Sequence, residues 1–232
     1  RLSHLRRRGR FAGELRNVRP AGGGSVRPPA GGSLDGVDWR GRDARASGAV
    51  TEVGNESDLT AAIANSTVDT VRLAGDISIS TSLTVKRTVT LDLNGHVLKY
   101  ESANKGSVIV VENGGQLTIE DSNTSNLSHK FNPNGKLWVL DEASGTETVT
   151  GGVITGGTGT DISTFGGTTW YCGGALIKNG GSLTMRGGNI IGCSAECGGG
   201  VCIDSEQGQF SMSDGSIAGC VASDIGGGVF AS

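Results

Sequence analysis

The sequence contains few of the residues that terminate secondary structure or fill large cores. Its 232 residues include 4 Pro, 3 Trp, 2 Tyr and 5 Phe. The low proline content argues against a generic Pro/Gly-rich disordered chain, and the scarcity of rings requires a core of Val, Ile, Leu and Ala. No run of residues approaches about 18 apolar positions, which excludes a membrane-spanning helix. No apolar stretch follows the N-terminal arginines, so no secretory signal is readable.

Charge is distributed unevenly along the chain. Residues 1–50 hold eleven Arg, no Lys and four acidic residues, whereas the remainder holds nine basic and nineteen acidic residues. A nucleic-acid function would have to reside in the first segment, and we expect no nucleic-acid partner. Residues 19–33 are linker-like in composition. We therefore predict a disordered Arg/Gly/Pro-rich leader over residues 1–50 and one folded domain over residues 51–232.

Glycine is abundant, and it recurs in a pattern. The chain has 41 glycines, more than twice the usual share. The motif GGAL at Gly173 returns as GGGV at Gly198 and at Gly226, which gives spacings of 25 and 28 residues. The motif NIIGCSA at Asn189 returns as SIAGCVA at Ser216. Internal repeats of this length, with short apolar segments between glycine corners, are typical of a solenoid.

The chain between the glycine corners predicts strands, with one short helix before them. Residues 70–100 alternate apolar and polar positions, which is the period of β-strands. Residues 58–65 predict a two-turn helix with Ser57 as its N-cap, and Leu59, Ala62 and Ile63 share one face. Equivalent strands of successive coils would pair in parallel about 4.8 Å apart, and glycine would make the corners. These patterns predict an all-β solenoid capped by the helix.

Two stretches resemble known repeat families. TSLTVKRTVTLDLNGHVL, which begins at Thr81 after ESDLTAAIAN, is similar to the first coils of the pectin-lyase-like superfamily. IIGCSAECGGGV at Ile190 and IAGCVASDIGGGV at Ile217 resemble the polymorphic outer-membrane-protein repeat, which pairs F-x-x-N with G-G-A-[ILV]. In this chain Ile replaces the Phe and Cys193 and Cys220 replace the Asn.

These resemblances imply a fold and a class of function. The first implies a right-handed parallel β-helix over residues 51–232, and the second implies an adhesin-like protein that is extracellular or displayed on a cell surface. The last repeat stops at Ser232. We therefore expect the solenoid to continue in a longer parent protein.

The phase of the repeat predicts which side chains point inward and which cysteines are equivalent. The predicted inward residues are Leu176, Leu183, Met185, Ile190, Val201, Phe210, Met212, Ile217 and Val229. Cys193 is equivalent to Cys220, and Cys172 to Cys197, in adjacent coils. Each pair would stack within reach of a disulfide, or form a ladder of small buried thiols, which we favour. Cys202 is expected to face the core.

The sequence shows no catalytic residues and no metal or cofactor site. After residue 50 it has three Arg and six Lys, and none of them are clustered. The three His are scattered, and no second C-x-x-C pair completes a zinc motif. A polysaccharide lyase or glycoside hydrolase, which the superfamily includes, remains the alternative to a non-enzymatic scaffold.

Two interruptions of the repeat are the predicted contact sites. The insertion at residues 120–136 and the loop at residues 158–171 carry Phe131, Phe165, Trp170 and Tyr171. Exposed rings commonly stack on sugars or anchor protein partners, and loops on a rigid scaffold often carry recognition. We therefore predict an adhesin-like scaffold that binds a glycan or protein surface ligand through these rings.

Overall fold

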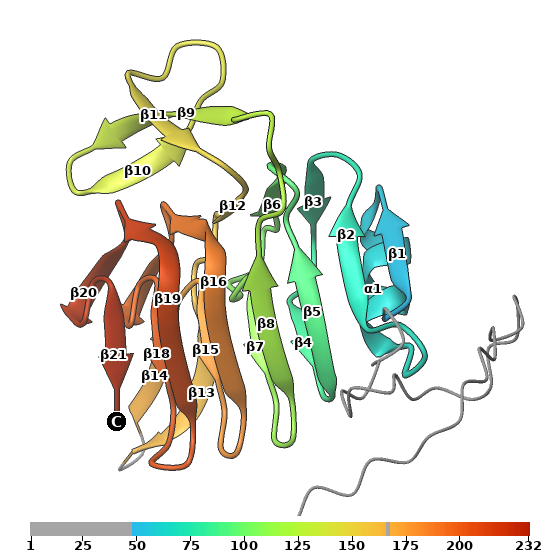
Figure 1. Cartoon of the computed structure of the whole chain (residues 1–232). Helices are drawn as coiled ribbons and strands as arrows, with labels where there is room; N and C mark the ends of the chain where they lie inside the picture. The colour runs from blue at the N-terminus through green and yellow to red at the C-terminus, as the bar shows by residue number, and fades with distance from the viewer. Residues whose placement is uncertain (1–47, 166–167) are drawn as a thin grey trace, which may run out of the picture. The chain divides into compact units, whose positions relative to one another are not determined.

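The domain that follows the arginine-rich segment is built almost entirely of β-strands. The computed structural model describes residues 48–165 and 168–232, without the side chains of residues 163–170. The described part of the chain is mostly β, with 52% strand and 5% helix. Figure 1 shows the arrangement of these strands. The all-β prediction is therefore confirmed. The leader predicted for residues 1–50 lies almost entirely outside the described residues.

The largest sheet is parallel throughout and curls into a half-barrel. Its strands, in spatial order, are β1 (Val50–Val53), β2 (Thr70–Leu73), β5 (Thr88–Asp92), β8 (Gln116–Glu120), β16 (Ser182–Ile191), β12 (Val153–Thr155), β6 (Val97–Tyr100) and β3 (Ile77–Ile79), with β19 (Gln209–Ala218) beside β16. The ten-residue strand β16 pairs with β8 through its first half and with β12 through its second half. Strand β16 therefore joins the part of the sheet that contains β8 to the part that contains β12, and the sheet bends along this strand (Figure 1).

A second parallel sheet closes the other side of the core. It contains β4 (Leu83–Val85), β7 (Ile109–Val111), β15 (Ala175–Ile177), β18 (Val201–Ile203) and β21 (Val229–Ala231). Strand β15 pairs in register with β18, and β18 with β21, so each strand lies beside its equivalent in the next repeat. Alternate residues of both sheets meet in one apolar cluster. The sequence repeat therefore predicts the strand pairing correctly.

Most of the predicted inward residues lie in this core. Leu183, Met185, Ile190 and Val201 are fully buried, and Phe210 and Ile217 pack against the same cluster. Met212 and Val229 are instead 40% and 42% exposed. Met212 is the register partner of Met185, so its phase is as predicted. It remains exposed because no further strand among the described residues pairs with β19.

Leu176 points away from the main core, contrary to the prediction. Its neighbours Ala175 and Ile177 belong to the core cluster, and successive residues of a strand point to opposite faces. Leu176 is buried in a separate cluster with Val110, Cys172, Cys197 and Cys202 on the outer face of β15. The prediction failed because both faces of this strand are apolar, so hydrophobicity does not distinguish them.

The N-terminal helix α1 (Glu56–Ala64) begins earlier than predicted. Its N-cap is Asn55 rather than Ser57, because the Asn55 side chain accepts a 2.9 Å hydrogen bond from the Asp58 N–H. Leu59, Ala62 and Ile63 are buried as expected. They cover the end of the core beside β1 and β2, which would otherwise expose apolar side chains.

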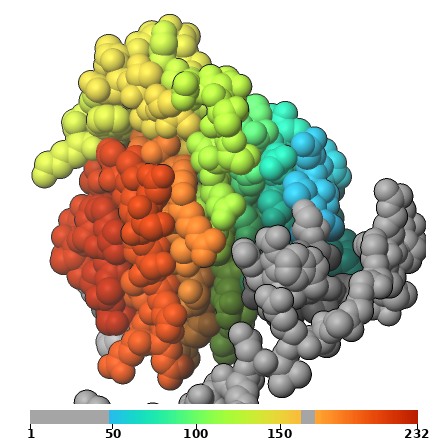
Figure 2. Space-filling view, viewed as in Figure 1, coloured from blue at the N-terminus to red at the C-terminus, as the bar shows by residue number. Residues whose placement is uncertain are grey.

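The two interruptions of the repeat form strands where we expected loops. One becomes the insertion sheet, the antiparallel strands β9 (Ser128–Asn134), β10 (Leu137–Leu140) and β11 (Glu147–Thr150). The other becomes the hairpin β13 (Thr160–Phe165) and β14 (Thr168–Cys172), followed in parallel by β17 (Ser194–Cys197) and β20 (Val221–Ile225). In Figure 2 the yellow insertion sheet lies directly against the orange and green parallel strands.

The cysteines follow the predicted stacking only in part. Cys172 is the register partner of Cys197, but its disulfide is with Cys202, with Cα atoms 5.6 Å apart. Cys193, Cys197 and Cys220 are free thiols, which agrees with the thiol ladder favoured for the pair Cys193 and Cys220. The prediction that Cys202 faces the core is wrong, because its side chain, like that of Leu176, points to the outer face of its strand.

Candidate functional site

A row of charged residues crosses the outer face of the large sheet, with one residue from each of the six strands β1, β2, β5, β8, β16 and β19. In register, it consists of Glu52, Arg72, Asp92, Glu120, Arg186 and Asp214. Glu120 follows Ile119, whose register partner is Met185, so Glu120 lies beside Arg186 at the β8–β16 boundary. We call this row the charge ladder. Neighbouring members of the charge ladder are up to 66 residues apart in the sequence. They lie side by side only because their strands pair in parallel.

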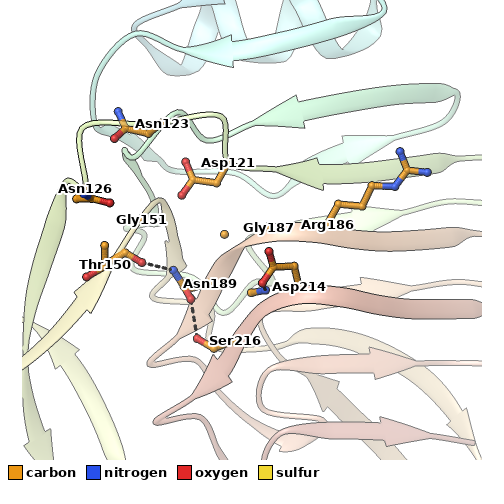
Figure 3. A pocket seen from close by; sticks show the side chains of 12 residues that line it. Asp121, Asn123, Asn126, Thr150, Gly151, Arg186, Gly187, Asn189, Asp214 and Ser216 are labelled. Atoms are coloured by element: carbon orange, nitrogen blue, oxygen red, sulfur yellow. Dashed lines mark hydrogen bonds between the residues drawn. The ribbon is translucent and has the colours of Figure 1, made fainter.

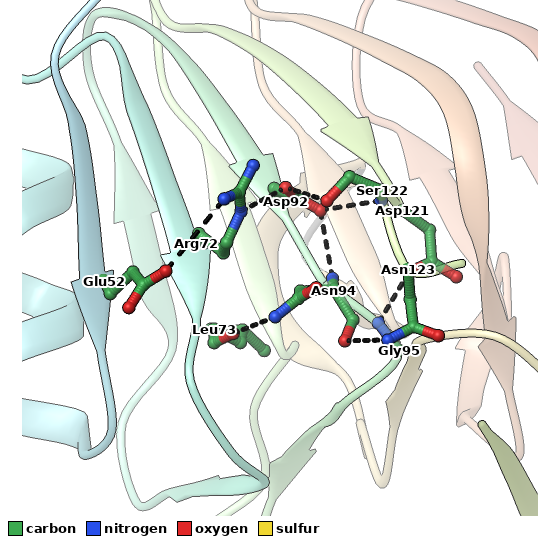
Figure 4. A network of polar contacts seen from close by, with 9 residues as sticks. All are labelled: Glu52, Arg72, Leu73, Asp92, Asn94, Gly95, Asp121, Ser122 and Asn123. Atoms are coloured by element: carbon green, nitrogen blue, oxygen red, sulfur yellow. Dashed lines mark hydrogen bonds and ion pairs between the residues drawn. The ribbon is translucent and has the colours of Figure 1, made fainter. Parts of the chain in front are cut away.

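Asp92 anchors the N-terminal half of the charge ladder (Figure 4). Its carboxylate accepts hydrogen bonds from Arg72 Nε at 2.8 Å, from Ser122 Oγ at 2.6 Å and from the Asn94 N–H at 3.0 Å. Burial alone would raise the pKa of Asp92, but these hydrogen bonds outweigh it and hold the pKa below its ordinary value. Asp92 in turn raises the pKa of Arg72. This part of the charge ladder is therefore structural.

The C-terminal half of the charge ladder borders a polar groove (Figure 3). The groove encloses about 390 Å³. Its lining residues are Asp121, Asn123, Asn126, Thr150, Gly151, Arg186, Gly187, Gly188, Asn189, Asp214, Gly215 and Ser216. They belong to β16, β19, the end of β8 and the two connections to the insertion sheet. The groove therefore crosses the neighbouring strands β8, β16 and β19 where the chain leaves for the insertion sheet.

Glycine forms the floor of this groove. The pairing of β16 with β19 shifts register between Arg186 and Asn189, at Gly187 and Gly188. Gly215 opposite has φ +93°, and a Cβ there would collide with the carbonyl oxygen of Gly188. The strands turn the corner here because only glycine permits this conformation and close approach. The absence of side chains leaves backbone exposed between the polar walls.

The walls are held in place by hydrogen bonds to the backbone. Asp121 accepts the N–H groups of Gly95 and Gly152, each at 2.6 Å. Asn189 donates to the Thr150 carbonyl at 3.0 Å and accepts from Ser216 Oγ at 2.6 Å. Figure 3 shows Asp121 and Asp214 on opposite sides of Gly187. These contacts fix the groove in the absence of any ligand, so binding would require little ordering.

The rim of the groove carries groups that can bind a ligand. Arg186 is exposed, and its Nη1 lies 3.7 Å from Glu120 Oε1. Asp214 is exposed and in register with Arg186, and its Oδ1 accepts the N–H of Gly215 at 2.7 Å. The sequence shows no clustering of basic residues, but the parallel pairing of strands places Arg186, like Arg72, beside acidic residues from neighbouring strands. Carboxylates, a guanidinium and hydroxyls arranged in this way suit recognition of sugar hydroxyls.

The four predicted contact residues do not form one site. Phe131 is fully buried against Val97, Val153 and Ile191, so its ring attaches the insertion sheet and cannot stack on a ligand. The side chains of Phe165 and Trp170 lie outside the described residues. Tyr171 is partly exposed, and Lys105 Nζ lies 3.9 Å from its ring centroid. It lines a second depression of about 450 Å³, which shares no residue with the groove.

The groove was missed in the sequence because its residues are common ones. Asp, Asn, Ser and Gly at these positions also serve corners and turns. The one available signal was the outward position directly after Leu91, Ile119 and Met185, which is charged in each case. In the next strand the charged residue is Asp214, two positions after Met212. That signal requires the register shift at the glycine corner to be known.

Within residues 48–165 and 168–232, no group of three or more His, Cys, Asp and Glu side chains is placed to hold a metal ion. The helix in this part of the chain is too short to cross a membrane. No family model, curated protein or solved structure matches the chain. The groove is therefore the feature from which a function can be inferred.

Proposed function

We propose that this protein is a non-enzymatic, extracellular or cell-surface scaffold that binds glycans in an adhesin-like manner, and that the groove is its principal binding site. The polar groove across successive coils supports this proposal more than any other observation. Its preformed walls offer carboxylates, a guanidinium and a hydroxyl, and its glycine floor lets a polymer lie close to the backbone. Carbohydrates need many such polar groups at fixed positions.

We also propose that the two parallel sheets belong to a closed β-helix and that the protein is extracellular. A closed, right-handed parallel β-helix is consistent with the in-register stacking of equivalent strands in both parallel sheets. An extracellular location is supported by the Cys172–Cys202 disulfide, since disulfides persist mainly in oxidising compartments. A rigid stack of coils is also a common means of presenting an extended binding surface.

A glycan array with the purified chain tests this function. We expect binding to a subset of polysaccharides, and binding that is weaker but still measurable in Arg186→Ala and in Asp214→Ala. Asp224→Ala is the matched control, because Asp224 is also an exposed aspartate near the C-terminus and lies outside the groove. Absence of binding by the folded wild-type chain to every glycan would contradict the proposal. Equal loss in the control would remove the groove as the site.

A second candidate function is supported by the same rim. Glu120 and Asp214 flank Arg186 along a groove that suits a polymer, and paired acids or an acid with an arginine base are the groups that glycoside hydrolases and lyases require. Product analysis of every glycan that binds decides between the two. Unchanged chain length after prolonged incubation supports a scaffold. New reducing ends, or unsaturated products, that disappear in Asp214→Asn or Arg186→Ala support an enzyme.

A further inference from the structure

The charges around the groove are unbalanced. Glu120, Asp121 and Asp214 supply three carboxylates at its rim and wall, and Arg186 supplies the guanidinium. The Asp121 carboxylate lies in the wall and accepts two backbone N–H groups. It forms no ion pair with any of the described residues. The group as a whole is negative. The surrounding domain has the same sign, since residues 51–232 hold nine basic and nineteen acidic residues.

Arg186 is not free to neutralise an incoming anion. Its Nη1 lies 3.7 Å from Glu120, and Asp214 is its register partner on the other side. A carboxylate or sulfate on a ligand would have to compete with both acids for the guanidinium. It would also approach Asp121 across the narrow glycine floor. Like charges at such distances repel in a partly desolvated groove.

Uncharged hydroxyls meet a better-matched surface. A sugar hydroxyl can donate to the Asp214 carboxylate, which accepts one N–H from Gly215 and has further acceptor capacity. The Ser216 hydroxyl and the Arg186 guanidinium can complete the contact from the adjacent wall and rim. Hydrogen bonds in which one partner is charged are stronger than neutral ones, so the acids favour a ligand that brings donors without bringing negative charge.

We propose that the groove takes an uncharged polysaccharide and discriminates against glycans that carry uronate or sulfate groups. This inference rests on the proposed function and adds the class of ligand. The discrimination should amount to roughly tenfold or more in Kd at low salt.

Matched ligands test the inference. Neutral oligosaccharides from the array are compared by calorimetry with the same oligosaccharides oxidised at C6 to uronates, so that shape is kept and charge is changed. We expect the neutral member of each pair to bind more tightly. The difference should shrink as salt is raised, because screening weakens the repulsion.

Two variants with opposite changes of charge complete the test. Asp214→Lys should narrow the preference for the neutral ligand, and Arg186→Glu should widen it; Asp224→Lys is the control and should change neither. Circular dichroism and a melting curve establish that each variant is folded, and both groove residues are exposed. Equal or tighter binding of the uronate by the wild type would overturn the inference while leaving the proposed function intact. Binding of neither ligand by the wild type would overturn both.

Discussion

Arg186 on β16 and Asp214 on β19 are register partners at the rim of the groove, although 28 residues separate them in the sequence. The relationship exists because equivalent strands of successive coils stack in parallel. The same stacking places Arg72 beside Asp92 at the other end of the charge ladder. The same parallel pairing thus produces a half-buried, structural ion pair at one end of the charge ladder and a solvent-exposed pair of opposite charges at the other.

The two methionines of one inward row should differ in their effect on stability. Met185 is fully buried, and its register partner Met212 is 40% exposed. Met185→Ala should lower the free energy of unfolding by about 2–5 kcal/mol, because it removes fully buried volume. Met212→Ala should lower it by less than about 1 kcal/mol, because little apolar area is lost. Urea unfolding measures both free energies, and equal losses would contradict the finding that Met185 is in the core and Met212 at its exposed edge.

Leu183 provides an independent test of the phase of the repeat. It is fully buried in the core, between the register partners Leu117 and Phe210. Leu183→Ala should also lower the free energy of unfolding by about 2–5 kcal/mol. The half-buried neighbour Thr184, which points to the opposite face of the same strand, is the control, and Thr184→Ala should have little effect. A loss below about 1 kcal/mol for the leucine would show that β16 has the opposite face inward.

Asp92 should contribute stability that depends on pH. Its folded-state pKa is lowered, since the hydrogen bonds from Ser122, Arg72 and Asn94 outweigh the effect of burial. Its contribution is therefore complete above the unfolded pKa of about 4 and is lost as pH falls through the lower folded value. Asp92→Asn should lower the free energy of unfolding by about 1.5–3 kcal/mol at neutral pH. The difference in free energy of unfolding between Asp92→Asn and wild type should diminish as the pH falls. A difference that does not change with pH would contradict an ionised Asp92 in the folded protein.

The cysteines predict a definite thiol count. The unreduced, unfolded protein should have three reactive thiols, from Cys193, Cys197 and Cys220, and reduction should release two more. Burial raises the pKa of the Cys197 thiol, so it should react slowly in the folded state. Removing the disulfide with Cys172→Ser and Cys202→Ser together should lower the free energy of unfolding by about 2–4 kcal/mol. Peptide mapping that finds Cys172 joined to Cys197 would contradict the assigned pairing.

Tyr171 remains a predicted contact residue outside the groove. Tyr171→Ala should weaken binding to an intact cell or mixed glycan surface without changing the melting temperature, because the ring is partly exposed. Tyr171→Phe keeps the ring and should retain binding. Unfolding of the alanine variant, with unchanged binding per folded molecule, would assign the ring a structural role beside Lys105.

The repeat made much of the fold predictable, but the site was not. Alternation and glycine spacing sufficed for the strands, for their parallel pairing and for Leu183 and Met185 in the core. They failed at Leu176, because strand β15 is apolar on both faces. They also failed at Phe131, because an isolated ring in a polar insertion is equally consistent with a contact residue and with an anchor. The groove depends on the register shift at Gly187 and Gly188, which no alternation pattern encodes.

The most direct test of the account is to map a bound glycan by NMR, using backbone amides. Addition of a neutral oligosaccharide identified on the array should shift the amide signals of Gly187, Gly188 and Gly215, which form the floor of the groove. Signals around Tyr171 and at Asp224 should remain unchanged with the same isolated oligosaccharide. Saturable shifts at the glycine floor would support glycan recognition by the groove. Saturable binding that leaves all three glycine signals in place would contradict it.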